Sequence, residues 1–287
     1  MSGARIKNLI LLILALAVCF LLLAVVPGKL SASHEETAIH EQLTELLAAY
    51  GVTLDPEALG QSEILYTVEL GGADAADVAA ALLGTEGALD AQSTRYELLY
   101  SASTGTVSFS RSGVLHAELC VPISGKSYER DLQRRLRGMG YAVWQTLPAV
   151  RQEDGVYALT VTQALLGQPL FGAQLTFSYR DSQLVAVDGL FYPETENPTR
   201  VSEESCISCA DALLQILASR DATGWVGSQI TAVRQGYLHA ETATAALRFT
   251  PVWRVETDTV VFYVNGITRE VRQAERRDEA FGIVKSQ

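Results

Sequence analysis

Apolar and polar residues follow three patterns along this chain, and each predicts a different kind of element. Residues 9–26 form an unbroken apolar run without a charged residue, amide, hydroxyl, glycine or proline. Elsewhere apolar residues recur at helical spacing, as Leu132 and Leu136 do, which is typical of amphipathic helices. The third pattern is strict alternation, as in residues 106–110, which predicts strands with one buried face.

The apolar run predicts a helix that crosses a membrane. At about 1.5 Å per residue it is roughly 27 Å long, and a short extension to residues 6–27 matches a hydrocarbon core of about 30 Å. Arg5 and Lys7 precede it, so the positive-inside bias predicts a cytoplasmic N-terminus, residues 1–5. The alternative is a cleaved secretory signal, whose apolar region is normally only about 7–15 residues long. We expect a single-pass protein of the cell membrane with an extracellular C-terminal domain.

Beyond a tether over residues 28–34, the pattern predicts helices that alternate with antiparallel strands. Ser202 is expected to open the last helix. The expected helices are 35–50, 74–84, 127–139 and 203–219. The expected strands are 63–70, 94–102, 106–111, 114–121, 141–146, 156–163, a hairpin over 169–193, 230–239, 245–256 and 260–271.

The order of these elements predicts the fold class. Three times a helix is followed by strands that end in a hairpin, and hairpins imply antiparallel sheets. We therefore expect an α+β protein in which one N-terminal transmembrane helix precedes an ectodomain of repeated helix-plus-antiparallel-hairpin units. The ectodomain is expected to contain an N-terminal subdomain, 35–122, and a C-terminal subdomain, 123–272. Residues 273–287 are expected to be a charged tail.

Composition narrows the classes of partner and cofactor. The chain has 22 Lys and Arg against 33 Asp and Glu, and Arg5, Lys7 and Lys29 all precede the expected ectodomain. An acidic ectodomain is a poor match for nucleic acid. Cys120, together with Cys206 and Cys209, makes an odd number of cysteines outside the apolar run, and the four histidines are scattered. We expect no disulfide framework, no metal and no cofactor.

Two stretches partly match catalytic motifs, and each has a simpler interpretation. Cys206 and Cys209 have the CxxC spacing of thiol redox proteins, and a helix start would lower a thiol's pKa. The strand-to-helix setting of such proteins is missing, so two semi-buried cysteines are the simpler interpretation. Ser127 ends a stretch that resembles a phosphate-binding loop, but Cys120 stands where that motif needs glycine. With no hydrolase motif either, we expect a protein that is not an enzyme.

Some residues are candidates for docking rather than catalysis. In the helix 127–139, Arg130, Arg134 and Arg137 form a basic outer face, with Arg135 at the edge of the apolar stripe. Aromatic residues could also supply docking surfaces, although a solvated helix face and core aromatics are the simpler interpretation. In the apolar run, Ala15 and Cys19 are four apart and could contact a neighbouring membrane helix. The aromatic candidates are Trp144, Phe191, Tyr192, Trp225, Trp253 and Tyr263.

Two stretches resemble known modules. Residues 249–271, with Pro251-Val-Trp253 and Tyr263-Val-Asn265, look like the closing hairpin of PepSY-like modules. Residues 168–192, from Gln168-Pro-Leu-Phe171 to Tyr192, are similar to a hairpin of the YycH/YycI regulators. With one N-terminal span and an outer domain of this size, the chain resembles the YycI type. The candidate family-motif positions are therefore Phe171, Tyr192, Trp253, Tyr263 and Asn265.

The resemblance implies a function and a partner. Proteins of the YycH/YycI type are non-enzymatic and membrane-anchored, and they modulate the cell-wall sensor histidine kinase WalK, also called YycG, of Gram-positive bacteria. It implies contact with that kinase, and with a YycH-type partner, outside and within the membrane. PepSY-like hairpins also occur in propeptides that inhibit proteases, so an inhibitor of an extracellular peptidase is the first alternative. A thiol redox protein that uses the CxxC pair is the second.

Overall fold

The computed structural model describes residues 42–274, except for 56–57, 61, 72–74, 86, 91, 124, 126, 153–154, 194–197 and 241–246. The chain divides after Pro56 into two units, which we describe separately. In the first unit, residues 42–49 are helical and are followed by strand β1 (Thr53–Leu54). This helical segment lies within the helix predicted over residues 35–50.

No helix within the described part of the chain is long and apolar enough to cross a membrane. The predicted span, 6–27, lies outside the described residues, as do the predicted cytoplasmic N-terminus, 1–5, and the tether, 28–34. Most of the predicted tail lies outside them as well, although Gln273 and Ala274 belong to a strand.

Within the described residues, the second unit contains the remaining strands and four helices. The helices are α2 (Ala75–Leu83), α3 (Tyr128–Gly138), α4 (Cys209–Ala218) and the short α5 (Arg220–Thr223). The strands are β2 (Val68–Leu70), β3 (Ala88–Leu89), β4 (Glu97–Ala102), β5 (Gly105–Ser110), β6 (Val114–Pro122), β7 (Val143–Thr146), β8 (Val150–Arg151), β9 (Tyr157–Leu165), β10 (Gln168–Arg180), β11 (Gln183–Leu190), β12 (Thr199–Arg200), β13 (Gln229–Ala240), β14 (Leu247–Thr257), β15 (Val261–Asn265) and β16 (Val271–Ala274).

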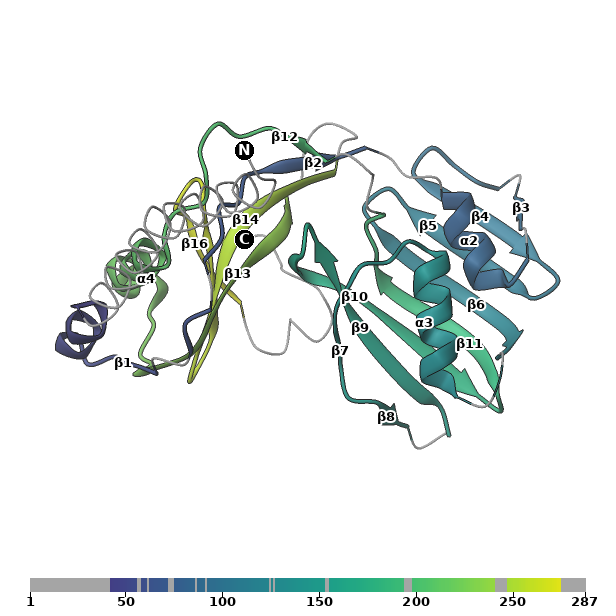
Figure 1. Ribbon diagram of the computed structural model, residues 1–287, viewed down its shortest axis with the longest axis horizontal. Coiled ribbons are helices and arrows are strands. Elements are labelled where there is room, and N and C mark those ends of the chain that lie inside the picture. The colour runs from purple at the N-terminus through teal and green to yellow at the C-terminus, as the bar shows by residue number, and fades with distance from the viewer. Residues whose placement is uncertain are drawn as a thin grey trace, which may run out of the picture. The chain divides into compact units, whose positions relative to one another are not determined.

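One part of the second unit is a helix-covered sheet in the order β3-β4-β5-β6-β11-β10-β9, with β7 and β8 both paired to β9. Helices α2 and α3 lie on the same face of this sheet (Figure 1). Strand β6 shows why, because Leu115, Ala117, Leu119 and Val121 are buried and the residues between them are exposed. These apolar side chains pack with those of α2, α3, β10 and β11 in one core.

The other part is a second sheet in which β12, β2, β14 and β13 follow one another and β15 and β16 continue from β14. Helix α4 contacts β14 and β15. Its Leu213 and Ile216 are buried, as are Trp253 of β14 and Phe262 of β15. The opposite face of this sheet carries Val252, Val261 and Tyr263, against which Phe171 and Leu238 pack.

Strand β10 belongs to both sheets because it leaves β9 part of the way along its length. Pro169 pairs with Ala164 and Gln174 pairs with Thr162, so residues 170–173 have only Gln163 opposite them. Within this stretch Leu170 pairs in parallel with Tyr237 of β13. The buried Gln163 amide uses the gap to bond the Tyr192 main chain, donating to its carbonyl oxygen and accepting from its N–H at 3.0 Å. An irregularity in one strand therefore joins the two sheets.

The predicted fold class is wrong. Instead of repeated helix-plus-antiparallel-hairpin units, strands dominate, and those of the described second unit belong to one mixed, hydrogen-bonded network. Strand β11 pairs with β6, and β14 pairs with β2, although the sequence assigns these partners to different units. Alternation shows which face of a strand is buried, but it does not show which strand lies beside it. The β6–β11 pairing crosses the predicted subdomain boundary near residue 122, and that division stays a prediction.

Two element boundaries also differ from the prediction. Helix α4 begins at Cys209 after a Ser208 cap, not at Glu203. The cause is tertiary, since the Cys206 N–H donates to the Leu65 carbonyl at 2.7 Å and the Ile207 N–H donates to the Gly266 carbonyl at 2.9 Å. These bonds hold the chain out of helical geometry. The predicted strand 260–271 is two strands, because a turn at 266–270 separates β15 from β16.

The predicted hairpin 169–193 is confirmed. Strands β10 and β11 pair from Leu175–Gly189 to Arg180–Gln183. Asp181 and Ser182 form the two-residue turn with φ values of 49° and 60°. Positive φ at both positions is the geometry that matches the right-handed twist of paired strands, and Asp tolerates it well.

Candidate functional site

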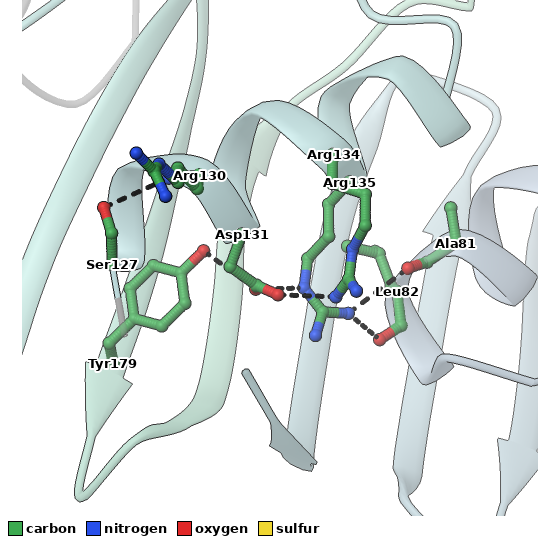
Figure 2. A network of polar contacts seen from close by, with 8 residues as sticks. All are labelled: Ala81, Leu82, Ser127, Arg130, Asp131, Arg134, Arg135 and Tyr179. Carbon is green, nitrogen blue, oxygen red and sulfur yellow. Dashed lines mark hydrogen bonds and ion pairs between the residues drawn. The ribbon is translucent and has the colours of Figure 1, made fainter. Parts of the chain in front are cut away.

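A network of polar contacts is centred on α3, and Figure 2 shows its residues. The carboxylate of Asp131 accepts from Arg134 Nη2 and from Arg135 Nε, both at 2.6 Å. Asp131 and Arg135 are buried, whereas the Arg134 side chain is 49% exposed. Tyr179 lies at the other side of Asp131, and burial together with the carboxylate raises the pKa of its hydroxyl.

The cluster closes the C-terminal end of α2. Arg135 Nη1 donates to the Ala81 carbonyl at 3.2 Å and to the Leu82 carbonyl at 2.8 Å. The Thr104 hydroxyl donates to the Leu83 carbonyl at 2.8 Å. A helix leaves its last carbonyl groups without intrahelical partners, and these contacts supply them. The cluster therefore holds two helices together, and Arg135, predicted at the edge of the apolar stripe of α3, is buried in the interior.

Burial raises the pKa of both cysteines of the CxxC pair. Cys209 is buried at the start of α4, and burial raises the pKa of its thiol to about 12. Burial also raises the pKa of the Cys206 thiol, although Gln235 and Trp253 act in the opposite direction. Here burial outweighs the helix dipole that the sequence suggests as a cause of a low pKa. Burial therefore disfavours the thiolate form of both cysteines.

A cavity of about 200 Å³ brings together residues from both sheets. We call it the β7 groove, and its lining includes Trp144, Phe171, Arg234, Arg254 and Tyr263. The rings of Phe171 and Tyr263 meet edge to face with centroids 5.7 Å apart. The Arg254 guanidinium carbon lies 5.9 Å from the Phe171 ring centroid. Two of the predicted docking positions, Phe171 and Tyr263, are thus in contact.

A β-bulge presents Trp144 to the groove. Val143 pairs with Gln163 and Gln145 pairs with Thr162, so Trp144 is the extra residue in β7. Bulges of this kind redirect a side chain and interrupt strand pairing. The Trp144 side chain is 43% exposed, unlike Trp225 and Trp253, which are buried. Among the tryptophans, Trp144 is therefore the one available to a partner.

Arginines form a row across the second sheet. Arg234 of β13 lies opposite Arg254 of β14, Arg254 lies opposite Tyr263 of β15, and Tyr263 lies opposite Arg272 of β16. Directly opposed residues point to the same face of a sheet. Arg254 forms an ion pair with Glu256, and Arg272 forms one with Glu270 at 3.2 Å. The Arg234 side chain is exposed and forms no ion pair with another residue that the structure describes.

Gly236 leaves room for the Phe171 ring beside β13. A Cβ atom at this position would be 2.5 Å from the Pro169 carbonyl oxygen and 2.7 Å from Phe171 Cε2. Both distances are shorter than van der Waals contact, so a side chain would displace β10 or the ring. The floor of the groove therefore depends on a glycine two residues from Arg234.

The other predicted positions lie elsewhere. Tyr192 is buried and stacks on His239 with ring centroids 5.0 Å apart. Burial raises the pKa of the Tyr192 hydroxyl to about 12. Trp253 is buried, and its indole N–H donates to the Ile207 carbonyl at 2.9 Å. The Asn265 side chain accepts from the Ile267 and Thr268 N–H groups and shapes the turn after β15. Ala15 and Cys19 lie outside the described residues.

The arginine row is the feature that sequence reasoning missed. Arg234, Arg254 and Arg272 are far apart in the sequence, and the chain as a whole has a formal net charge of −11. Each of the three falls at a polar position of an alternating strand, which is the signal that could have found them. Their alignment depends on the register of four strands, which alternation does not determine.

Comparisons with known proteins add little to this geometry. No family model matches the chain, and no curated protein matches it. An uncharacterized protein from Eubacterium rectale is similar in structure with a TM-score of 0.45 and 9% identity, covering 77% of this chain and 85% of the other. The Bacillus megaterium YpeB C-terminal domain is similar with a TM-score of 0.33 and 8% identity, covering 82% of this chain and 98% of the other. At TM-scores below 0.5, neither similarity carries an argument about function.

Proposed function

We propose that this chain is a non-enzymatic regulator that binds a membrane sensor histidine kinase and modulates it. In this proposal residues 6–27 anchor the chain in the cell membrane, and the β7 groove on the extracellular side contacts the partner. The family resemblance in residues 168–192 and 249–271 supplies the kind of partner.

The observation that carries the proposal is the β7 groove itself. It combines a partly exposed tryptophan, the pair of aromatic rings from Phe171 and Tyr263, and two arginines. Tryptophan, tyrosine and arginine are enriched where proteins bind one another. Phe171 comes from one family-like stretch and Tyr263 from the other, and their rings are in contact. The groove lining includes one carboxylate, Glu256, and it is already paired with Arg254, so the surface supports binding better than catalysis.

The test is recovery of the partner from native membranes. The full chain, tagged at its C-terminus, is cross-linked in cells, extracted with detergent and purified, and the bound proteins are identified by mass spectrometry. We expect a sensor histidine kinase, and we expect Trp144→Ala to reduce its recovery. Tyr96→Ala is the matched control, because Tyr96 is 72% exposed and does not line the groove.

Recovery of a secreted peptidase in place of a kinase would favour the inhibitor alternative and overturn this proposal. The redox alternative has its own test, in which Cys206→Ser is combined with Cys209→Ser. The doubly substituted chain is expected to bind and regulate as the wild type does. Loss of regulation in a correctly folded double variant would point to thiol chemistry instead.

The membrane span is tested separately. Replacing residues 9–26 with an unrelated apolar helix is expected to keep the protein at the membrane and to weaken regulation, because Ala15 and Cys19 offer a small-residue contact face. Equal regulation with the foreign helix would assign residues 9–26 to anchoring alone.

A further inference from the structure

We propose that the β7 groove binds an extended, carboxylate-bearing segment of a partner protein. The segment pairs with the open edge of β7 and places an acidic side chain at Arg234. This inference rests on the proposed function, since it names the chemistry of the partner at the same groove.

The open edge supplies the backbone pairing. Strands β7 and β8 pair with β9 alone, so no described strand occupies their other edge (Figure 1). Edge strands usually carry charged residues or proline, which discourage pairing with another chain. Strand β7 contains neither, and Val143 and Trp144 are 42% and 43% exposed. An edge of this kind accepts an added strand, a recurrent mode of peptide recognition.

The arginines supply the charge preference. Arg234 lies directly opposite Arg254, and like charges in this position repel each other. Arg254 is compensated by Glu256 and by the Phe171 ring, whereas Arg234 has no ion-pair partner among the described residues. A carboxylate brought into the groove would relieve this repulsion and pair with the guanidinium of Arg234.

The same features favour a peptide over a polyanion. A nucleic acid or an anionic membrane would extend beyond the groove and meet a chain whose formal net charge is −11. A peptide strand carries its charges singly, and its alternate side chains can reach Trp144 on one side and solvent on the other. The groove is therefore matched to isolated carboxylates on an extended backbone.

The experiment uses the full chain in detergent and three short blocked peptides in which valine alternates with glutamate, glutamine or lysine. Binding is followed by calorimetry and by amide hydrogen exchange of residues 143–146. We expect the glutamate peptide to bind and to slow exchange in β7, and the lysine peptide not to bind at concentrations up to about 1 mM. Arg234→Glu is expected to lower the affinity for the glutamate peptide by at least about tenfold.

Two controls make the outcome specific. Arg130→Glu makes the same charge change on the exposed face of α3 and is expected to leave binding unchanged. A glutamate peptide with N-methylated backbone amides retains its carboxylates but cannot pair as a strand, so we expect it to bind weakly. Equal binding of the glutamate and glutamine peptides, equal binding of the methylated peptide, or no binding of the glutamate peptide would overturn the inference.

The inference and the proposed function fail in different ways. If cross-linking recovers a histidine kinase equally well with the wild type and with Arg234→Glu, the partner stands and the inference is wrong. If the glutamate peptide binds as expected but no kinase is recovered, the β7 groove does bind carboxylate-bearing segments, and the proposed function is wrong.

Discussion

The polar cluster on α3 and the β7 groove use the same kinds of side chain with opposite results. Each contains two arginines, one carboxylate and at least one aromatic ring. On α3 the carboxylate of Asp131 is buried and accepts from both arginines, and Arg135 also bonds the end of α2. In the groove Arg234 is exposed and its neighbouring carboxylate, Glu256, pairs with Arg254. Residue type alone therefore does not distinguish a structural cluster from a binding surface. The distinction lies in burial and in how many polar groups already have partners.

The largest expected effect comes from breaking the buried cluster. Asp131→Ala would leave Arg135 buried without its carboxylate, which typically costs about 3–5 kcal/mol. We expect a loss of this size in the free energy of unfolding, measured by urea denaturation. The matched control is Arg130→Ala on the exposed face of the same helix, expected to change stability by less than about 0.5 kcal/mol. Similar stabilities for the two variants would show that the cluster is not structural.

A smaller effect is expected where the two sheets join. Gln163→Leu would remove both bonds to the Tyr192 main chain and leave a buried N–H and a buried carbonyl without partners. We expect a loss of about 2–3 kcal/mol, since each buried unsatisfied polar group costs about 1–3 kcal/mol. Urea denaturation measures the change. Gln145→Leu, at an exposed position of β7, is the control and should have little effect. A stable Gln163→Leu variant would mean that the β10 irregularity needs no side-chain support.

The buried thiol of Cys209 predicts a pH dependence. Its pKa is raised from 9.0 to about 12 by burial, so the thiolate forms more readily in the unfolded chain. The stability contributed by the neutral buried thiol is complete below pH 9 and is lost as the pH rises towards 12. Relative to Cys209→Ala, the wild type should lose at most about 1.4 kcal/mol per pH unit in that window. Parallel pH profiles of the two proteins would contradict the burial of this thiol.

The smallest expected effect on stability comes from the groove. Trp144→Ala should change the free energy of unfolding by less than about 0.5 kcal/mol, as is usual for surface substitutions. Trp253→Ala is the contrasting variant, because removing a fully buried tryptophan typically costs about 3–5 kcal/mol. Thermal or urea denaturation compares the two. A large loss in Trp144→Ala would make this side chain structural and weaken its assignment to a binding surface.

Local signals predicted the elements well. Leu132 and Leu136 of α3 are buried, as the helical spacing predicts, and the structure adds a Ser127 cap at the start of this helix. The Asp181-Ser182 turn predicts the β10–β11 hairpin, because few residues tolerate its backbone geometry. Helix α4 was predicted to begin too early, because the backbone bonds that hold Cys206 and Ile207 outside the helix come from distant segments.

The candidate site was predictable only in part. Trp144, Phe171 and Tyr263 of the groove could be selected as candidates from the sequence, but so were Tyr192 and Trp253, which do not line it. Tyr263 is itself buried, as Tyr192 and Trp253 are. An aromatic residue in an alternating strand has the same local pattern whether its face is covered by a helix or left open. Burial is decided by what packs on the strand, and that information is not local.

By itself, the sequence determined helices α2 and α3, the alternating strands and the apolar run of residues 9–26, since each depends on residues close together in the chain. Composition alone determined the excess of acidic over basic residues. The tertiary structure decided which strands pair, and through that pairing it aligned Arg234 with Arg254 and Tyr263. It also decided that Arg135 is buried and that Trp144 is exposed. The physical reason is that strand pairing joins residues far apart in the chain, and no local pattern of polarity specifies the partner or the register.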